Sequence, residues 1–230
     1  MLLPLYDKNP LRILPYQAVT AGLIIINILA HLYRINLIGI NRDAFLFAFG
    51  LIPQVLWNEA QLEVGLVRLS AEMTLLSSLF LHSDFLHLAG NILFLWVFGD
   101  NVEESMGHWK FLVFYLLCGI GAGLTHAFLN PGSGVPLIGA SGAIGGVLGA
   151  YLLLHPRVKV VALIFMSFPI LLPAYMVLGS WLIIQIVLIV TDSAGNMAVW
   201  AHLGGFAVGV ALIPIFKHSH IPLFDRGTEH

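Results

Sequence analysis

The stretch LIGASGAIGGVLGAY, residues 137–151, places a single serine, Ser141, among five glycines in an otherwise apolar run. In this stretch and in one other, glycines lie four residues apart and form three pairs, Gly142/Gly146, Gly145/Gly149 and Gly205/Gly209. Small residues at this spacing let two helix backbones approach closely inside a membrane. The stretch therefore predicts a helix that packs against a second glycine-bearing helix, with Ser141 near its start.

The composition is that of a protein that crosses a membrane several times. Of the 230 residues, 59% are hydrophobic and 10% are charged, and the mean hydropathy is +0.92. Ordinary soluble domains have about a quarter of their residues charged. The net charge of −2, without a basic stripe, gives no electrostatic footprint for nucleic acid, so nucleic-acid binding is set aside. Cys118 is the single cysteine, so it can form neither an intramolecular disulfide nor a cysteine-based metal site.

Six segments have the roughly 20 mostly apolar residues that a membrane-spanning helix needs. They are residues 13–33, 83–102, 110–129, 137–155, 172–190 and 199–216. The expected fold class is therefore an all-α membrane protein with a six-helix core, residues 13–216. A short segment, 1–12, precedes this core and a polar tail, 217–230, follows it.

Two apolar stretches are not expected to span. Residues 45–57 are interrupted by Gly50 and Pro53, which fits an interfacial or partly embedded loop. Pro169 and Pro173 argue against an unbroken helix over 158–190, so the fifth span is placed after them.

The distribution of Lys and Arg predicts the orientation. Seven of these residues fall on the side of the N-terminus: Lys8, Arg12, Lys110, Arg157, Lys159, Lys217 and Arg226. Three fall on the other side, in the long connection after the first span: Arg34, Arg42 and Arg68. Positive residues favour the cytoplasmic side, so both termini are expected there, in a multi-pass protein of the cytoplasmic membrane.

The second, fourth and sixth spans are then parallel, and each begins with polar residues at the outer face. These residues are His82, Ser83, Asp84, His87 and Asn91 in the second span, Ser141 in the fourth and His202 in the sixth. Polar side chains inside a bilayer are costly and usually mark function. The sequence therefore predicts one site at this depth, open to the extracytoplasmic side.

Ser141 and His202 form a plausible reactive pair within this site. Each precedes its glycine pair by a similar offset, so contact between the two helices would bring the hydroxyl and the imidazole within hydrogen-bond reach. A serine becomes a nucleophile when a neighbouring histidine takes its proton. Because no carboxylate accompanies Ser141 or His202 on the fourth and sixth spans, packing is expected to orient His202. The candidate donors for the oxyanion of an acyl intermediate are His87, Asn91 and the backbone N–H of Ser141.

These residues resemble those of the rhomboid intramembrane serine proteases. The resemblance covers roughly residues 15–216 and rests on HSDFLHLAGN at 82–91, GDNVEESMG at 99–107, GASG at 139–142 and AHLGGFAVG at 201–209. Each motif alone is weak, but the set in this order is specific to the family.

By this resemblance, Ser141 is the nucleophile, His202 the general base, and His87 and Asn91 belong to the oxyanion hole. Supporting positions are Gly139, Gly142, Gly205, Gly209 and His82. The implied reaction is hydrolysis of a peptide bond in or near the transmembrane segment of a substrate protein, without metal or nucleotide cofactor. The implied gate lies near the fifth span, with TDSAGN at 191–196 as a flexible cap over His202.

This chain departs from the family pattern at three places. Met73 and Thr74 stand near the usual Trp-Arg pair of the first loop, and Ser105 stands where an arginine is common. Gly145 replaces an aromatic residue that stacks on the histidine in some members, so another group must support the ring of His202.

Four other functions compete with a serine protease. A rhomboid-like protein that binds and traffics membrane clients without cutting them would share the fold, but typically lacks the serine or the histidine. A metalloprotease would need a motif such as HExxH, which is absent. An aspartyl protease needs two intramembrane aspartates. A transporter would need polar groups through the whole membrane, whereas residues 93–98 and 208–216 are apolar. The sequence sets no oligomeric state.

Overall fold

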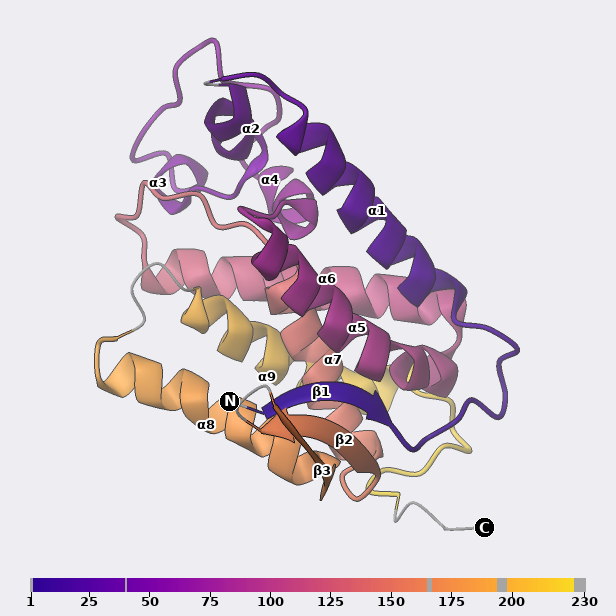
Figure 1. Cartoon of the computed structure of the whole chain (residues 1–230). Coiled ribbons are helices and arrows are strands. Elements are labelled where there is room, and N and C mark those ends of the chain that lie inside the picture. Colours follow the sequence, from indigo (N-terminus) through magenta and orange to yellow (C-terminus); the bar gives the residue numbers. More distant parts are fainter. Residues whose placement is uncertain (1, 40, 165–166, 194–197, 226–230) are drawn as a thin grey trace.

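The computed structural model describes residues 2–39, 41–164, 167–193 and 198–225. It is mostly helical, with one small sheet (Figure 1). In chain order the elements are β1 (Leu2–Asp7), α1 (Ala18–Ile35), α2 (Asn41–Phe49), α3 (Pro53–Leu56), α4 (Thr74–Ser77), the 3-10 helix η1 (Ser78–Phe80), α5 (Phe85–Met106), α6 (His108–Leu129), α7 (Ser141–Leu154), β2 (Lys159–Ile164), β3 (Phe168–Pro173), α8 (Ala174–Val190) and α9 (Val199–Phe216).

Four of the described helices, α1, α5, α6 and α9, are long and apolar enough to cross a membrane. The other two expected spans correspond to shorter apolar helices, α7 with 14 residues and α8 with 17. At 1.5 Å per residue, α7 is only about 20 Å long, against roughly 30 Å of hydrocarbon. It begins at Ser141 rather than at the expected residue 137, because residues 137–140 form the approach to the helix.

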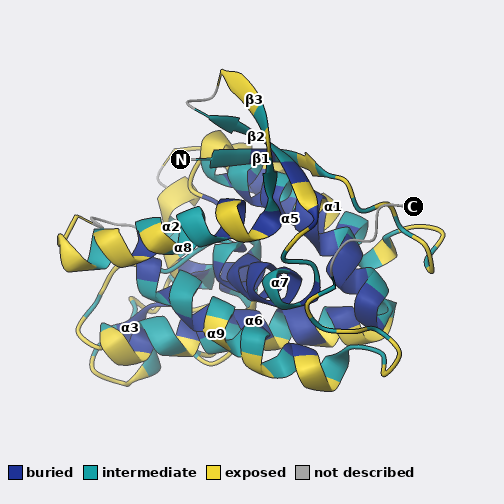
Figure 2. Ribbon diagram, turned by 90° about the horizontal axis from the view of Figure 1, so that it is seen from below, coloured by how far each residue is buried: buried dark blue, intermediate teal, exposed yellow. Residues whose placement is uncertain are grey.

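The short helix α7 forms the centre of the bundle. Most of its residues are buried, and Figure 2 shows it enclosed by the other helices. Its closest neighbour is α9, because glycines of the two helices meet backbone to backbone. A Cβ on Gly205 would stand 1.8 Å from the carbonyl oxygen of Gly142, and one on Gly145 would stand 2.7 Å from that of His202. Any side chain at these positions would therefore separate the helices.

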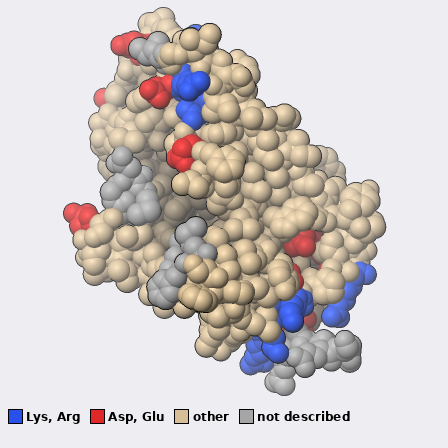
Figure 3. Space-filling model, in the orientation of Figure 1, with Lys and Arg blue, Asp and Glu red and all other residues tan. Residues whose placement is uncertain are grey.

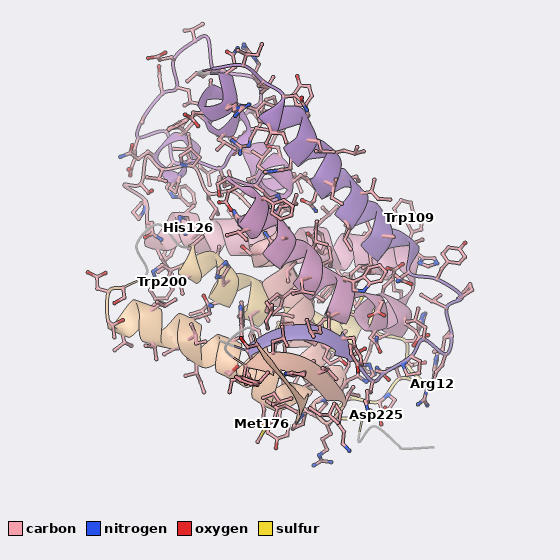
Figure 4. All side chains as sticks on the ribbon, in the orientation of Figure 1. Arg12, Trp109, His126, Met176, Trp200 and Asp225 are labelled. Atoms are coloured by element: carbon pink, nitrogen blue, oxygen red, sulfur yellow. The ribbon has the colours of Figure 1, made fainter. Side chains whose placement is uncertain are left out.

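On the face shown in Figure 3, most charged side chains gather toward two opposite ends of the molecule, and uncharged residues form most of the surface between these ends. In Figure 4, His126 and Trp200 lie near one end, whereas Arg12 and Asp225 lie near the other. The end that carries His126 and Trp200 is formed by the C-terminus of α6 and the N-terminus of α9. This arrangement suits a bundle whose uncharged belt lies in the hydrocarbon.

The long connection after α1 packs against residues 137–140, the loop that leads into α7. Its stretch at 45–57 forms α2 and α3 rather than a span, as the sequence predicts. Leu51 is fully buried and pairs with Leu137 through two backbone hydrogen bonds of 3.0 and 2.7 Å. The connection therefore holds in place the loop that leads to Ser141.

The expectation of an all-α protein is wrong, since β1, β2 and β3 form an antiparallel sheet in that order. The sheet brings residues 2–7 together with residues 159–173. From the sequence, the first segment is expected to be part of the short N-terminal stretch and the second an apolar stretch that does not span, and no pairing between them is expected. Pro4, Pro169 and Pro173 lie on the edge strands β1 and β3. The central strand, KVVALI, contains no proline. Proline cannot donate to a ladder and is tolerated at sheet edges, so this order lets all three strands pair. β1 also lies against α5 and α8.

Asp7, at the end of β1, connects the sheet to α7. Its carboxylate accepts a 2.5 Å hydrogen bond from the hydroxyl of Tyr151. Burial raises the pKa of Asp7 to about 7; the hydrogen bond from Tyr151 opposes this shift, and the charge of Asp100 on α5 adds to it. Asp7 therefore titrates near neutral pH in the folded protein.

This titration predicts a loss of stability with rising pH. An acid whose folded pKa is raised contributes stability that is fully present below its unfolded pKa, here about 3.8, and that is lost as the pH rises through about 7. We therefore expect the melting temperature in detergent to fall between about pH 5 and about pH 8. In Asp7→Asn the fall should be smaller. An equal fall in the two proteins would show that Asp7 is not the group responsible.

Glu103 fixes the start of α1 from the far end of α5. Its carboxylate is fully buried and accepts hydrogen bonds from the backbone N–H groups of Val19 (2.9 Å) and Thr20 (2.8 Å). It also pairs with the ring of His108. A carboxylate at a helix N-terminus satisfies donors that have no partner within the helix. Glu103 therefore ties α1, α5 and α6 together, although Ser105 replaces the arginine common in the family.

Candidate active site

Ser141 and His202 lie in contact at one end of the bundle. Ser141 is the first residue of α7, and His202 is in the first turn of α9. The distance between Ser141 Oγ and His202 Nε2 is 2.9 Å. The close approach of α7 and α9 along their glycines brings together these two residues, which are 61 positions apart in the sequence. This is a hydrogen bond of ordinary length between a hydroxyl and an imidazole nitrogen.

Gln185 on α8 holds the other side of the imidazole. Its Oε1 lies 2.9 Å from His202 Nδ1. A carbonyl oxygen can only accept, so Nδ1 carries the proton and donates to Gln185. In the neutral ring Nε2 is then free to accept the proton of the Ser141 hydroxyl. The three side chains therefore form a chain of hydrogen bonds from α7 through α9 to α8.

Sequence reasoning missed Gln185. The signal was present, since Gln185 is a lone amide in the apolar run of α8, and a polar side chain inside a membrane helix usually has a function or a partner. Trp181, one turn earlier on α8, was also missed. Its ring lies 6.0 Å from that of His202. Gly145 has no side chain that could support the ring of His202. Gln185 and Trp181 on α8 provide this support instead.

His87 lies beside the approach to Ser141. Gly139 has a φ of +118°, and a Cβ there would stand 2.7 Å from His87 Nε2 and 3.6 Å from Ser141 Oγ. Both groups therefore face the same small space over Gly139, which only a glycine leaves open. The N–H of Gly139 donates to the carbonyl of Ser78 at 2.9 Å and so anchors this turn.

The start of α5 fixes the ring of His87. Asp84 caps the helix by accepting from the backbone N–H of His87 at 2.9 Å. Ser83 Oγ lies 2.7 Å from Asp84 Oδ2 and 3.2 Å from His87 Nδ1. The hydroxyl donates its single proton to the carboxylate, which can only accept, so its oxygen is left to accept from His87 Nδ1–H. When the hydroxyl instead turns to donate to His87 Nδ1, the neutral ring carries its proton on Nε2, on the side that faces Gly139.

Asn91 and His82 are both buried. Asn91 lies one turn after His87, and its Nδ2 has no hydrogen-bond partner in the described part of the chain. Buried donors are rarely left without a partner, so this amide is available to a bound group. The ring of His82 packs edge-on against that of His87 at 5.0 Å, and neither of its nitrogens has a partner among the described residues. His82 therefore acts here as a packing neighbour of His87.

Within the residues that the structure describes, no group of three His, Cys, Asp or Glu side chains is arranged to hold a metal ion. The side chains around Ser141 offer chemistry of their own. A hydroxyl is paired with a neutral, oriented imidazole, and a histidine ring and a free buried amide lie nearby on α5.

Comparison with known proteins gives the family. A family model described as the rhomboid domain matches residues 70–219, which include both Ser141 and His202. The chain is 32% identical over 151 residues to RHOMBOID-like protein 12, mitochondrial, of Arabidopsis thaliana, and the match covers 59% of this chain and 44% of that protein. It is 30% identical over 151 residues to Rhomboid protein 1, mitochondrial, of Saccharomyces cerevisiae, with 61% and 41% covered.

A bacterial relative is more similar over a shorter region. The chain is 44% identical over 78 residues to Rhomboid protease GluP of Bacillus subtilis, which is 34% of this chain and 15% of that protein. In all three comparisons the matched part spans less than half of the relative. The family model, however, matches well over half of this chain. The chain therefore belongs to the rhomboid family.

Proposed function

We propose that this chain is an intramembrane serine endopeptidase that hydrolyses peptide bonds in or near the transmembrane segments of other proteins. The observation that carries this proposal is the 2.9 Å contact between Ser141 Oγ and His202 Nε2 at the end of an otherwise apolar bundle. A half-buried hydroxyl whose proton is directed at an oriented imidazole is not needed for the stability of an apolar bundle, and it is the arrangement that activates a serine. The protease names of some relatives, such as GluP, agree with it.

The first step is attack by Ser141 Oγ on the carbonyl carbon of the substrate peptide. As the C–O bond forms, the hydroxyl proton moves to His202 Nε2. The ring becomes an imidazolium, and its Nδ1–H donates more strongly to Gln185 Oε1. The carbonyl oxygen takes up the negative charge and accepts hydrogen bonds from Asn91 Nδ2–H and the N–H of Ser141, and from His87 Nε2–H once the Ser83 hydroxyl donates to His87 Nδ1. That N–H is among the first of α7, which have no partner within the helix.

Collapse of this intermediate completes the reaction. The peptide C–N bond breaks, and His202 gives its proton to the leaving amine. A water molecule then attacks the ester on Ser141, again with His202 as the base, and the carboxylate product leaves with Ser141 restored. All the groups needed belong to the chain and to water, so the proposed reaction uses no cofactor.

Incubation with single-span test proteins tests the proposal. The purified full chain and each test protein would be reconstituted together in liposomes. Because a helical peptide bond is shielded by its own hydrogen bonds, the test segments should carry helix-destabilising glycine or proline. Products whose masses correspond to hydrolysis of one peptide bond support the proposal. A protein that binds the test segments but leaves all of them intact would instead be the client-binding, non-cutting rhomboid.

In this proposal α7 and α8 also cross the membrane, which gives six spans with both termini on one side, expected to be the cytoplasmic side. Arg12 and Asp225 lie at the same end of the molecule, which supports this topology. The names of the Arabidopsis and yeast relatives include the word mitochondrial. These names do not support the cytoplasmic membrane that the sequence predicts. The proposal therefore states that the protein lies in a membrane and does not name which one.

The outer part of α8 has the packing expected of a gate. Among residues 179–190, all described, Gln185 is the only buried residue. Its hydrogen bond to His202 and the ring contacts of Trp181 with His202 and Phe206 connect this half of the helix to α9. Part of the cap predicted at 191–196, residues 194–196, lies outside the described residues. In the proposed mechanism, movement of α8 admits the substrate, and its return restores the bond that orients the base.

We expect Gln185→Met, which removes the acceptor, to lower kcat about 10- to 100-fold with a small change in KM, since a hydrogen bond to a charged group contributes about 1.5–3 kcal/mol. Gln185→Glu keeps an acceptor and should restore most of kcat. Ile186→Met, on the exposed side of α8, serves as the control for changes in packing. A Gln185→Met enzyme with normal kcat would remove Gln185 from the mechanism.

A further inference from the structure

A cavity lies between α1 and α5, outside the candidate active site. Its volume is about 810 Å³, within the range of about 300–1,000 Å³ that is usual for ligand pockets. Its walls are mainly apolar and include Ile28, Leu32, Leu88, Ile92, Leu93 and Trp96. Figure 1 shows the two helices running side by side along the bundle. We call this cavity the α1/α5 groove.

The mouth of the groove is polar, at the end of the molecule where Ser141 and His202 lie. Arg34, in the last turn of α1, lines it together with Ser83, Asp84 and His31. Arg34 is 7% exposed, and its Nη2 donates to the carbonyl of Ser83. Its Nε, like Nδ1 of the 6% exposed His31, has no partner in the described parts of the chain.

Such a guanidinium needs an anion. A buried charge without a partner is strongly destabilising, and among the described residues no carboxylate forms an ion pair with Arg34. Asp84 is exposed, and its two oxygens already accept from the N–H of His87 and from Ser83 Oγ. The mouth therefore presents one buried cation and one exposed anion. A phosphate and an amine on the same headgroup match these two charges.

The length of the groove indicates what fills its apolar part. On α5 it runs from Phe85 to Trp96, which is about 16 Å at 1.5 Å per residue. This is close to half of the roughly 30 Å hydrocarbon core. A transmembrane helix would need a groove across both leaflets, whereas an acyl chain lies within one leaflet and has its headgroup at the surface.

We propose that the α1/α5 groove binds a phospholipid with an amine headgroup, phosphatidylethanolamine, from the leaflet nearest Ser141. Its phosphate accepts hydrogen bonds from Arg34, its amine faces Asp84, and one acyl chain runs along α5 toward Trp96. The guanidinium is well suited to a phosphate because its planar donors match two oxygens at once. The lipid also touches Ser83, which positions the ring of His87.

Native mass spectrometry of the full chain in detergent tests this proposal, with phosphatidylethanolamine and dioleoylglycerol as the probes. We expect one phosphatidylethanolamine to stay bound under conditions that strip dioleoylglycerol, which has no phosphate. Arg34→Gln should weaken its binding about tenfold or more, and Arg34→Lys by less. Ala89→Trp, which fills the groove, should remove the bound lipid.

Two control variants match these changes outside the groove. Arg42→Gln removes an exposed arginine of the same connection, and Val113→Trp adds bulk to an exposed position on α6. Both should bind phosphatidylethanolamine like the native chain, and melting temperatures will show which variants are folded. Equal retention of the two lipids, or unchanged binding by folded Arg34→Gln and Ala89→Trp, would overturn the proposal. Displacement of the lipid by a hydrophobic helical peptide, or a dimer that Ala89→Trp dissociates, would assign the groove to a protein partner instead.

Discussion

Ser141→Ala and His202→Ala are each expected to lower the cleavage of a membrane-embedded substrate by about 10³-fold or more. Ser141 supplies the atom that forms the acyl bond, and His202 must take its proton while that bond forms. Groups that act as one unit have non-additive effects, so the double variant should be no worse than either single variant. The measurement is the initial cleavage rate in liposomes at equal protein content.

Matched variants separate this effect from general damage to the fold. Ser219→Ala and His220→Ala change the same residue types at exposed positions of the tail that follows α9, outside the site, and both should cleave at the native rate. Retention of more than about a tenth of the native rate by Ser141→Ala would show that another residue is the nucleophile. A double variant much slower than both single variants would show that the two residues act separately.

Gly205→Ala is expected to cause the largest loss of stability of any single methyl addition in the bundle. The new Cβ would stand 1.8 Å from the carbonyl oxygen of Gly142, closer than any non-bonded contact allows. Since the obstacle is the backbone of the central helix α7, no side-chain rotation relieves it and the helices must move apart. We expect destabilisation of about 3 kcal/mol or more, at or beyond the upper end for overpacked cores.

Gly179→Ala provides the control, since a Cβ on this α8 glycine meets nothing within 4 Å. It should leave stability unchanged or raise it by about 0.5–1 kcal/mol, the usual gain of alanine over glycine in a helix. Thermal unfolding in detergent, followed by tryptophan fluorescence, compares the two variants. Similar melting temperatures for Gly205→Ala and the native chain would mean that α7 and α9 do not pack as described.

Much of the arrangement around Ser141 could be predicted because membrane helices follow few rules. Glycines at four-residue spacing predict close helix contact, and similar offsets of Ser141 and His202 from their glycine pairs predict that both residues lie at about one height. The contact at 2.9 Å agrees with that reasoning. The polar start of α5 was equally visible, since polar residues in an apolar segment carry a strong positional signal.

The rest depends on contacts that no local pattern carries. The sheet pairs residues 2–7 with residues 159–164, which lie far away in the sequence, and its short apolar strands resemble pieces of membrane helix. Gln185 was visible as the one amide side chain in α8, but its partner depends on how α8 packs against α9. The same holds for Arg34, whose burial follows from the position of α1 beside Ser83.

The central claim is that Ser141 is an activated nucleophile. Covalent labelling of the full chain in detergent with a fluorophosphonate probe, followed by mapping of the modified residue, tests it without any knowledge of the substrate. The account predicts an adduct on Ser141 in the native chain and no adduct in Ser141→Ala or His202→Ala. A folded native chain that takes up no probe, or an adduct that persists in Ser141→Ala, would contradict it.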